Sequence, residues 1–522
     1  MEKSIGAFLP LFKSALEEGR IMDKRTLLSE KRRICESLST AEIPKNGEIL
    51  SNLDKAYISK FSEILKSKPV RTLSGVTVVA LMTKPFDCPH GVCIFCPGGT
   101  RVNTPQAYTG FEPAARRAKA NNYDPYDQVQ ARLKHYLFMG YEPQKIEIIA
   151  IGGTFTTLPK LYRDDFITNI YRAMNDFPQN KNDRHGSLQE QKKINETAAV
   201  RCVTFAIETK PERCNLGDVK QLLEYGVTRV EMGVQSVYDD VLKKNNRGHT
   251  IGDVRSASKL LRNNAYKVDY HVMLNLPFSD IDKDKGTISA IYEDESLKPD
   301  AIKIYPTLVI KGTGLYNLWK DGKHSVYPLE DIITLIAEAE VSAPRWLRIM
   351  RVERDIPSNL IEDGVKVTNL RQLVSDRIRE IGKKANDIRS REIGHSQLTK
   401  KTTIQMKRED YRASGGDEIF LSIDDTANDA IIGFIRLRVQ DGSSESLVRE
   451  LHVYGEQKTI ASDEPGGFQH KGFGKQLLEE AEKITRNEYS LHKVKIISGV
   501  GVREYYRKEG YRLKGPYMVK EI

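Results

Sequence analysis

Residues 76–99 read VTVVALMTKPFDCPHGVCIFCPGG, a largely apolar segment followed after a short loop by Cys88, Cys93 and Cys96. Three thiolates on one loop can each bind one iron of a cubane cluster, because soft thiolate ligands suit iron–sulfur clusters. The fourth iron then lacks a protein ligand and can chelate the amino and carboxyl groups of S-adenosylmethionine (SAM). The stretch therefore predicts a [4Fe–4S] cluster beside a buried strand, with Cys88, Cys93 and Cys96 as its ligands.

The alternative for these cysteines is a structural zinc site of the Cys3His type, in which His90 supplies the fourth ligand. Two features favour the cluster: the loop follows a strand, and an aromatic residue, Phe95, precedes the third cysteine. The other three cysteines are scattered along 522 residues, which argues against a disulfide framework. We therefore predict the cluster and keep zinc as the alternative.

Short apolar segments, each followed by a helical stretch, continue from residue 71 to about residue 340. The candidate strands are Val76–Met82, Ile146–Ile151, Val203–Glu208, Arg229–Val234, Tyr270–Leu274 and Ala301–Tyr305. This alternation predicts an α/β domain with a parallel sheet, and six units indicate a partial (β/α)6 barrel. Functional groups of such barrels lie at the carboxyl ends of the strands, so we expect Gly152, Gly153, Glu208 and Gln235 to bind SAM there.

A different domain is expected over residues 402–522. Alternating strands at 418–423, 431–439 and 447–454 predict a mixed α+β domain with an antiparallel sheet. The segment QHKGFG (469–474) then opens a helix with one apolar face, and its glycines allow backbone N–H groups to approach a pyrophosphate. A glycine-rich loop alone is weak evidence for a pyrophosphate site. The preceding strand residues 450–454 and the later Tyr505 and Tyr506 strengthen the prediction. The alternative for the two tyrosines is that they only pack in the core or on a helix surface.

The net charge of +10 is concentrated in two segments. Residues 1–70, expected to be a small helical region, carry +3, and residues 341–412, which include a basic linker at 341–401, carry +7. Such surfaces attract phosphate backbones, although a solvated basic surface is the alternative. No apolar run has the length of a membrane helix, and the start is too broken by charge for a secretory signal, so we expect no membrane contact and a cytoplasmic protein.

The motifs together identify a family. In chain order they are MTKPFDCPHGVCIFCPGG, YTGFEPAARRA, IGGTFTTLP, GVQSVYDDVL, KIYPTLVIKGTGLY, NLRQLV, ELHVYG, QHKGFGKQLLEEAE and GVREYYRKEGYRLKGPYMVK. The chain resembles the catalytic subunit of Elongator in its stand-alone archaeal or bacterial form, in which a radical SAM domain is fused to a GNAT acetyltransferase domain. The gap of four residues between Cys88 and Cys93, where three is commonest among radical SAM enzymes, agrees with this subfamily.

The resemblance implies a tRNA uridine(34) acetyltransferase that uses acetyl-CoA and radical SAM chemistry to begin 5-carboxymethylation of the wobble uridine. The resemblance also implies that Lys145, in the radical SAM domain, contacts acetyl-CoA. It further implies that Tyr505 or Tyr506 lies near the thioester. On the acetyltransferase side it implies acetyl-CoA contacts for Glu450, Leu451, His452, Val453, Phe473, Gly474, Lys475 and Tyr506. We therefore expect Lys145, Tyr505 and Tyr506 to be catalytic and the anticodon stem-loop of tRNA to be the partner.

One departure from the family concerns zinc. Many members carry Cys-x-Cys-x-x-Cys before an Arg-Glu-Ile-Gly stretch, and those positions here are Ala385, Asp387 and Ser390. We therefore expect no zinc. A protein lysine acetyltransferase and a tRNA-binding scaffold with an inactive SAM site stay as rival hypotheses. The sequence identifies neither the reductant nor the oligomeric state, and a homodimer is compatible with it.

Overall fold

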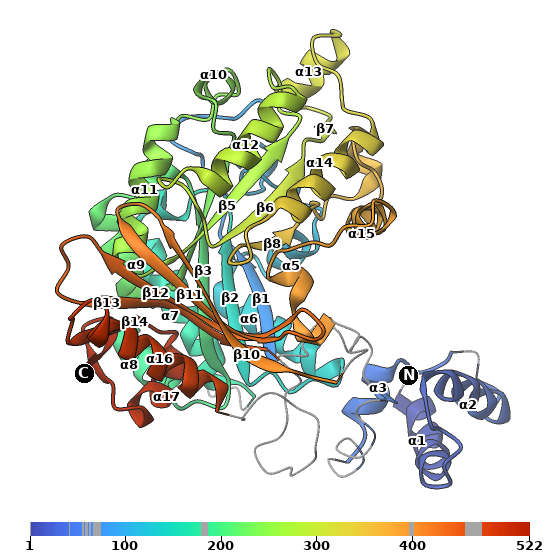
Figure 1. Ribbon diagram of the computed structural model, residues 1–522. Helices are drawn as coiled ribbons and strands as arrows, with labels where there is room; N and C mark the ends of the chain where they lie inside the picture. The colour runs from blue at the N-terminus through green and yellow to red at the C-terminus, as the bar shows by residue number, and fades with distance from the viewer. Residues whose placement is uncertain are drawn as a thin grey trace.

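The computed structural model describes residues 2–40, 42–54, 57, 61, 64–65, 75–178, 186–395, 401–454 and 472–522. The N-terminal part is helical, as expected, with α1 (Glu2–Glu17), α2 (Lys24–Ser37) and α3 (Asn46–Ser51). These helices pack their apolar faces together into a separate small core. Its members recur at helical spacing and include Phe8, Phe12, Leu27 and Ile34. Figure 1 shows this part set to one side of the rest of the molecule.

The central part is a curled, wholly parallel sheet of seven strands. Its order is β1 (Val76–Met82), β2 (Lys145–Ile151), β3 (Arg201–Thr209), β4 (Arg229–Gln235), β5 (Lys267–Leu274), β6 (Ala301–Pro306) and β8 (Arg348–Arg351). The six expected strands are confirmed in their expected order. The seventh, β8, comes from the segment expected to be a linker; with only four residues and an arginine at each end, it shows no apolar period.

Helices cover the outside of this sheet (Figure 1). They are α5 (Pro113–Ala120), α6 (Pro125–Phe138), α7 (Lys160–Asp176), α8 (Leu188–Asn195), α9 (Leu216–Tyr225), α10 (Asp239–Lys244), α11 (Ile251–Asn263), α12 (Ile281–Glu293), α13 (Gly314–Lys320), α14 (Leu329–Ser342) and α15 (Leu370–Glu380). Because side chains alternate along a strand, Val79 and Ile148 are fully buried in the main core, whereas Val78 is 37% exposed on the inner face. The interior of the partial barrel is therefore not filled along β1.

The C-terminal part is a mixed sheet of seven strands in the order β10-β11-β12-β13-β14-β16-β15. The strands are β10 (Ile404–Arg412), β11 (Gly416–Asp425), β12 (Ala430–Gln440), β13 (Ser446–Val453), β14 (Lys493–Ile497), β15 (Arg512–Lys514) and β16 (Tyr517–Glu521), with α16 (Phe473–Asn487) and α17 (Arg503–Lys508). β13 and β14 are parallel and pair only over Ser446–Val448. Beyond Val448 the two strands part, which leaves the backbone of residues 449–453 unpaired on the β14 side.

Buried ion pairs fix the second sheet against the amino ends of the barrel strands. Arg449 of β13 lies 2.6 Å from Asp300, just before β6, and 2.7 Å from Glu418 of β11. Burial opposes the charge on Asp300, but Arg449 and its neighbouring arginines outweigh that and hold the pKa of Asp300 well below its usual range. Removing one partner from such a network leaves an uncompensated buried charge, so the two parts are held in one relative position.

None of the described helices is long and apolar enough to cross a membrane.

Candidate functional site

The cysteine loop lies at the carboxyl end of β1, and each sulfur has a polar neighbour. The Thr154 hydroxyl lies 3.5 Å from the Cys88 sulfur, and the Ala107 N–H donates to the Cys96 sulfur at 3.1 Å. The Arg247 guanidinium donates to the Cys93 sulfur at 3.2 Å. Burial raises the pKa of the Cys88 and Cys96 thiols, so binding to iron is what would hold them as thiolates.

The spread of the thiols favours a cluster over zinc. In a tetrahedral site with Zn–S bonds of about 2.3 Å, the ligand atoms would lie within about 4 Å of one another. Among the residues described, only Glu208, Glu231 and His271 form a group of three candidate ligands within 4.8 Å; the cysteines with His90 do not. That carboxylate group is already compensated, because Lys303 and Arg229 form ion pairs with Glu231. The residues on the loop therefore fit an iron–sulfur cluster.

The residues expected to bind SAM gather beside this loop. Gly152 and Gly153 follow β2 with φ of +140° and +96°, and a Cβ on Gly152 would lie 2.2 Å from the Thr83 hydroxyl, so a side chain does not fit there. Glu208 accepts a hydrogen bond from the Tyr108 hydroxyl at 2.9 Å. Gln235 has a left-handed backbone, and its buried side-chain oxygen has no partner among the described residues. An unpaired buried acceptor is the kind of group that a bound ligand satisfies.

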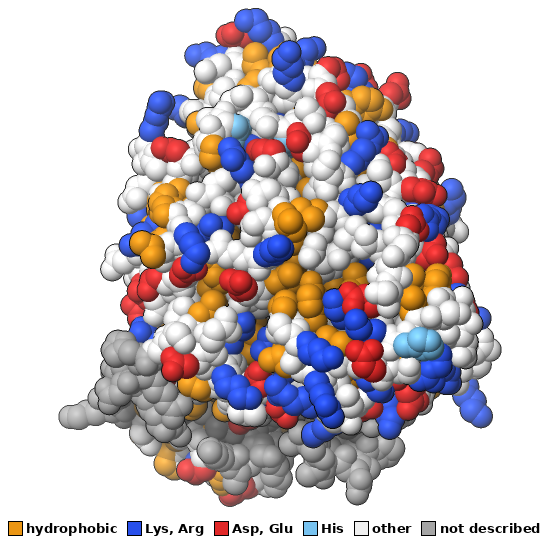
Figure 2. Space-filling view, turned by 90° about the vertical axis from the view of Figure 1, so that its left-hand side faces the viewer, with side chains coloured by type: hydrophobic (Ala, Val, Ile, Leu, Met, Phe, Trp, Pro, Cys, Tyr) orange, Lys and Arg blue, Asp and Glu red, His pale blue; other side chains and the backbone are white. Residues whose placement is uncertain are grey.

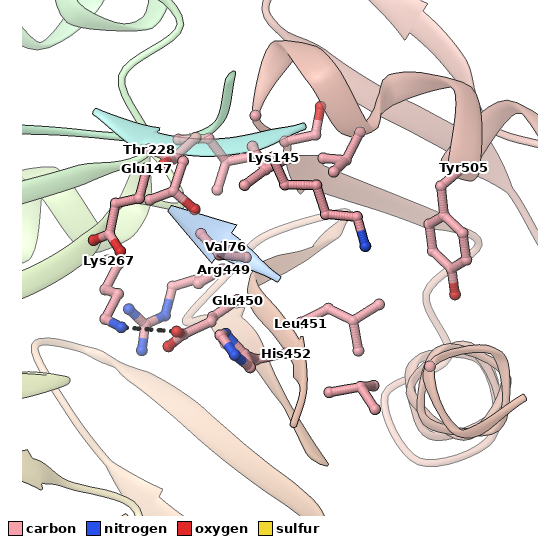
Figure 3. Close-up of a pocket in the computed structure, with 18 of the residues that line it drawn as sticks. Val76, Lys145, Glu147, Thr228, Lys267, Arg449, Glu450, Leu451, His452 and Tyr505 are labelled. Atoms are coloured by element: carbon pink, nitrogen blue, oxygen red, sulfur yellow. Dashed lines mark hydrogen bonds and ion pairs between the residues drawn. The ribbon is translucent and has the colours of Figure 1, made fainter. Parts of the chain in front are cut away.

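A second site lies at the opposite, amino end of the strands. It is a cavity of about 670 Å³ between the two parts of the molecule. It brings together Lys145, Glu450, Leu451, His452, Val453, Phe473, Gly474, Lys475, Tyr505 and Tyr506, all expected from the sequence to contact acetyl-CoA or to be catalytic. Figure 3 shows the Lys145 amine pointing into the cavity from β2, with Glu450 and His452 on one side and Tyr505 on another. Gln469, His470 and Lys471, from the same motif, lie outside the described residues.

The start of α16 is shaped to approach a ligand closely. Gly472 caps the helix with a φ of +79°, and the first N–H groups of a helix have no partners within it. Gly474 follows, and a Cβ there would lie 3.1 Å from the Tyr505 hydroxyl. Tyr505 is 37% exposed, whereas Tyr506 is buried. Free N–H groups beside a positive helix end make this the natural place for a pyrophosphate.

The charges of the cavity favour a polyanion. Lys145, Lys267, Arg229, Arg348 and Lys475 line it. Burial and the neighbouring Arg201 lower the pKa of Lys145. Glu450 is held ionised: burial opposes the charge, but Lys267 and Arg436 outweigh burial and lower the pKa of Glu450 to about 2. The cavity thus presents more cationic than anionic groups to a ligand.

Ala385, Asp387 and Ser390, the positions compared above with the zinc motif of the family, lie in a hydrogen-bonded turn. The fully buried Asp387 accepts hydrogen bonds from the N–H groups of Ile349 at 2.9 Å and Arg389 at 3.0 Å. The Ser390 N–H and hydroxyl also donate to Asp387. Ala385 packs against the main core. Side-chain and backbone hydrogen bonds thus connect this turn to β8.

Several residues at both sites were not found from the sequence. Arg247 and Ala107 reach the cysteine sulfurs, Tyr108 reaches Glu208, and Lys267 and Arg348 line the cavity. Arg247 lies between α10 and α11, in the connection that begins after Gln235 at the end of β4, so a search of that whole connection could have found it. Lys267 and Arg348 begin their strands, whereas functional groups of a partial barrel were expected at the carboxyl ends.

A curled parallel sheet with three cysteines at one strand end defines a radical SAM enzyme, and the chain matches the radical SAM superfamily over residues 85–285 and the radical SAM C-terminal domain over residues 299–380. This class binds a [4Fe–4S] cluster and SAM. Residues 13–73 match the ELP3 N-terminal domain. The chain belongs to the Elongator complex protein 3 family.

The relatives cover nearly the whole chain. A tRNA uridine(34) acetyltransferase of Methanocaldococcus jannaschii is 45% identical over 92% of this chain and 90% of its own length. Elongator complex protein 3 of Homo sapiens is 40% identical over 100% of this chain and 97% of its own. The structure of the archaeal Methanocaldococcus infernus Elp3 with an N-terminal deletion (1–46) matches with 40% identity and a TM-score of 0.75, covering 86% of this chain and all of that one.

Proposed function

We propose that this protein is a tRNA uridine(34) acetyltransferase that uses acetyl-CoA to build a carboxymethyl group at C5 of the wobble uridine. The observation that carries the proposal is one rigid chain with a radical SAM site and a second, cationic cavity at the start of α16. The names of the full-length relatives support the same reaction and the same RNA.

The two sites lie at opposite ends of the same strands. Lys145 begins β2 and Gly152 follows its end, so at about 3.3 Å per residue roughly 20 Å separates them. On the inner face of β1 and β2, the partly exposed Val78, Ala80 and Ile149 form an apolar wall beside the ion pair of Glu147 and Arg229, which are 2.6 Å apart. An extended pantetheine arm can follow this apolar wall from the cavity toward the cysteine loop, which would bring the acetyl methyl near SAM.

Each set of residues then has a distinct task. The free N–H groups at the start of α16 bind the pyrophosphate, and the unpaired backbone of residues 450–453 binds the amides of pantetheine. Lys145 and Tyr505 contact the pantetheine arm where it leaves the cavity for the barrel, and Tyr506 packs beneath Tyr505, with the two ring centres 5.2 Å apart. When bound, the cluster and SAM supply a 5′-deoxyadenosyl radical after reduction by an external donor.

The test uses acetyl-CoA that carries deuterium in its methyl group. The cluster-loaded protein, SAM, a reductant and tRNA should yield deuterated 5′-deoxyadenosine and carboxymethyluridine, both detected by mass spectrometry. Replacement of Cys93 and Cys96 by Ala should abolish both products together with the iron content. Acetyl groups transferred to protein lysines, with no modified uridine in any tRNA, would contradict the proposal.

A further inference from the structure

A second pocket lies beside the cysteine loop, and nothing in the reaction described so far uses it. It has a volume of about 340 Å³, within the range of small-molecule sites. Its walls come from the start of α5, the end of β6, the segment after β8, and the start of α15. We call it the α5–α15 pocket; its lining includes Phe111, Arg116, Pro306, Arg354, Ile356 and Lys366.

Hydrogen bonds connect this pocket to the cluster ligands. The Arg354 guanidinium donates to the carbonyl of Ala107, and the N–H of Ala107 donates to the Cys96 sulfur at 3.1 Å. Arg354 also lies over the ring of Tyr305, 5.9 Å from its centre. One residue thus separates a wall of the pocket from a cluster ligand, so a group bound in the pocket would lie at the reacting end of the barrel.

The chemistry of the walls suits a flat, partly polar ring. Phe111 is 52% exposed although it lines the pocket, and Pro113, Pro306 and Ile356 add apolar surface. Exposed aromatic rings with arginines nearby are the usual means by which proteins hold unpaired nucleobases.

The charge around the pocket is positive. Asp355 is paired with Arg351 at 2.7 Å, and burial raises the pKa of Glu353. Arg116, by contrast, is exposed and has no ion-pair partner within the described ranges. From the pocket, α15 leads to the exposed Lys383 and Lys384, for which the described part of the chain likewise holds no ion-pair partner. They follow the end of α15, a helix about 16 Å long, which is the span of several phosphates.

α5 and α15 lie on the right-hand side of Figure 1, next to β8. Figure 2 shows the left-hand side, where acidic and basic side chains are interspersed around apolar ones. Part of the segment that carries a net +7, between residues 353 and 370, lines the α5–α15 pocket and contributes Arg354 and Lys366 along with Glu353 and Asp355.

We infer that the α5–α15 pocket binds one unpaired nucleotide of the RNA substrate, with the base on Phe111 and the backbone on Arg116. The inference rests on the proposed function and adds the site at which the RNA enters the barrel. A SAM adenine or an acidic peptide segment are the other occupants that the experiment distinguishes.

The experiment measures binding of an anticodon stem-loop to the full-length, cluster-loaded protein by fluorescence anisotropy. Two RNAs are compared, one with uridine and one with an abasic site at the target position. The natural protein should bind the uridine RNA about tenfold more tightly. Phe111→Ala should bind both RNAs nearly equally, whereas Phe111→Tyr, which keeps the ring, should retain the preference. Leu161→Ala, which removes an 84% exposed side chain elsewhere, is the matched control.

The charge is tested on the same helix. The Arg116→Ala variant should bind both RNAs more weakly, by the same factor. The slope of log K against log salt concentration should also become shallower by about one unit. Lys119→Ala should change neither the affinity nor the slope. SAM cleavage without RNA should be unchanged in all variants. A 4-thiouridine at the target position should crosslink to the peptide that contains Phe111.

Three outcomes would overturn the inference. The first is that the Phe111→Ala variant keeps the preference for the uridine RNA. The second is that this variant loses SAM cleavage as strongly as it loses RNA binding. The third is that a polyglutamate peptide displaces the RNA from the natural protein but not from the Phe111→Ala variant. If the natural protein forms carboxymethyluridine but shows no preference for uridine, the pocket inference fails and the proposed function stands. If it modifies no tRNA, the proposed function itself fails.

Discussion

Lys267, the first residue of β5, forms a 2.7 Å ion pair with Glu450 of β13, and this pair joins the radical SAM barrel to the second sheet on the wall of the cavity proposed for acetyl-CoA. Both side chains are mostly buried, with 12% and 13% of their surface exposed. Glu450 also accepts a hydrogen bond from Arg436 at 2.9 Å. The shape of the cavity therefore depends on contacts between residues 183 positions apart.

Replacing Lys267 by Met should destabilise the protein by about 3 kcal/mol, because Glu450 would keep its buried charge with one partner fewer. Thermal unfolding of the cluster-free protein measures this. The double variant Lys267→Met/Glu450→Gln should recover part of the loss. Additive losses would show that the pair does not couple the two parts.

The same pair predicts a dependence on pH. Since the pKa of Glu450 falls from about 4.5 to about 2 on folding, its stabilisation is complete above pH 4.5 and is lost as the pH falls toward 2. The difference corresponds to about 3 kcal/mol. The gap in melting temperature between natural protein and Glu450→Gln should therefore shrink below pH 4.5. A constant gap from pH 6 to pH 3 would contradict this.

Gly474→Ala should weaken acetyl-CoA binding about tenfold, because its Cβ would lie 3.1 Å from the Tyr505 hydroxyl at the mouth of the cavity. Isothermal titration calorimetry measures the affinity. Tyr505→Phe removes the crowding hydroxyl, so Gly474→Ala/Tyr505→Phe should bind better than Gly474→Ala alone. Equal affinities of the two would mean that this contact does not limit the ligand.

Asp387→Ala should lower the stability by about 3 kcal/mol, since it leaves the N–H groups of Ile349, Arg389 and Ser390 without their acceptor. Ser390→Ala, which removes only a donor, should cost about 1 kcal/mol. Melting temperatures with and without added zinc give the comparison. A zinc-dependent rise in the melting temperature of the natural protein that Asp387→Ala abolishes would show that a metal, and not the hydrogen-bonded turn alone, holds this segment.

Arg247→Met should leave the iron content unchanged but make the reduction potential of the cluster more negative, because a hydrogen bond to the Cys93 sulfur is lost. Redox titration followed by electron paramagnetic resonance measures the potential. Lys244→Met, an exposed substitution three residues earlier, is the control. An unchanged potential would place Arg247 outside the set of groups that tune the cluster.

Much of the barrel could be predicted because its strands are short apolar runs separated by helical segments. β8 could not, because Arg348 and Arg351 at its ends mask any apolar period in four residues. The pairing of Arg247 with Cys93 links positions 154 residues apart, and no local pattern encodes such a contact.

The sequence by itself predicted the three cysteines as cluster ligands, the order of the first six strands and the helix at α16, since each prediction rests on local spacing that the backbone must follow. Only the tertiary structure decided that the cavity proposed for acetyl-CoA lies at the amino ends of the strands while the cysteines lie at the carboxyl ends. It also decided that Lys267 meets Glu450 and that Arg354 reaches the cysteine loop through Ala107. These relations depend on how the two sheets dock, and docking is set by buried ion pairs between distant residues rather than by any short motif.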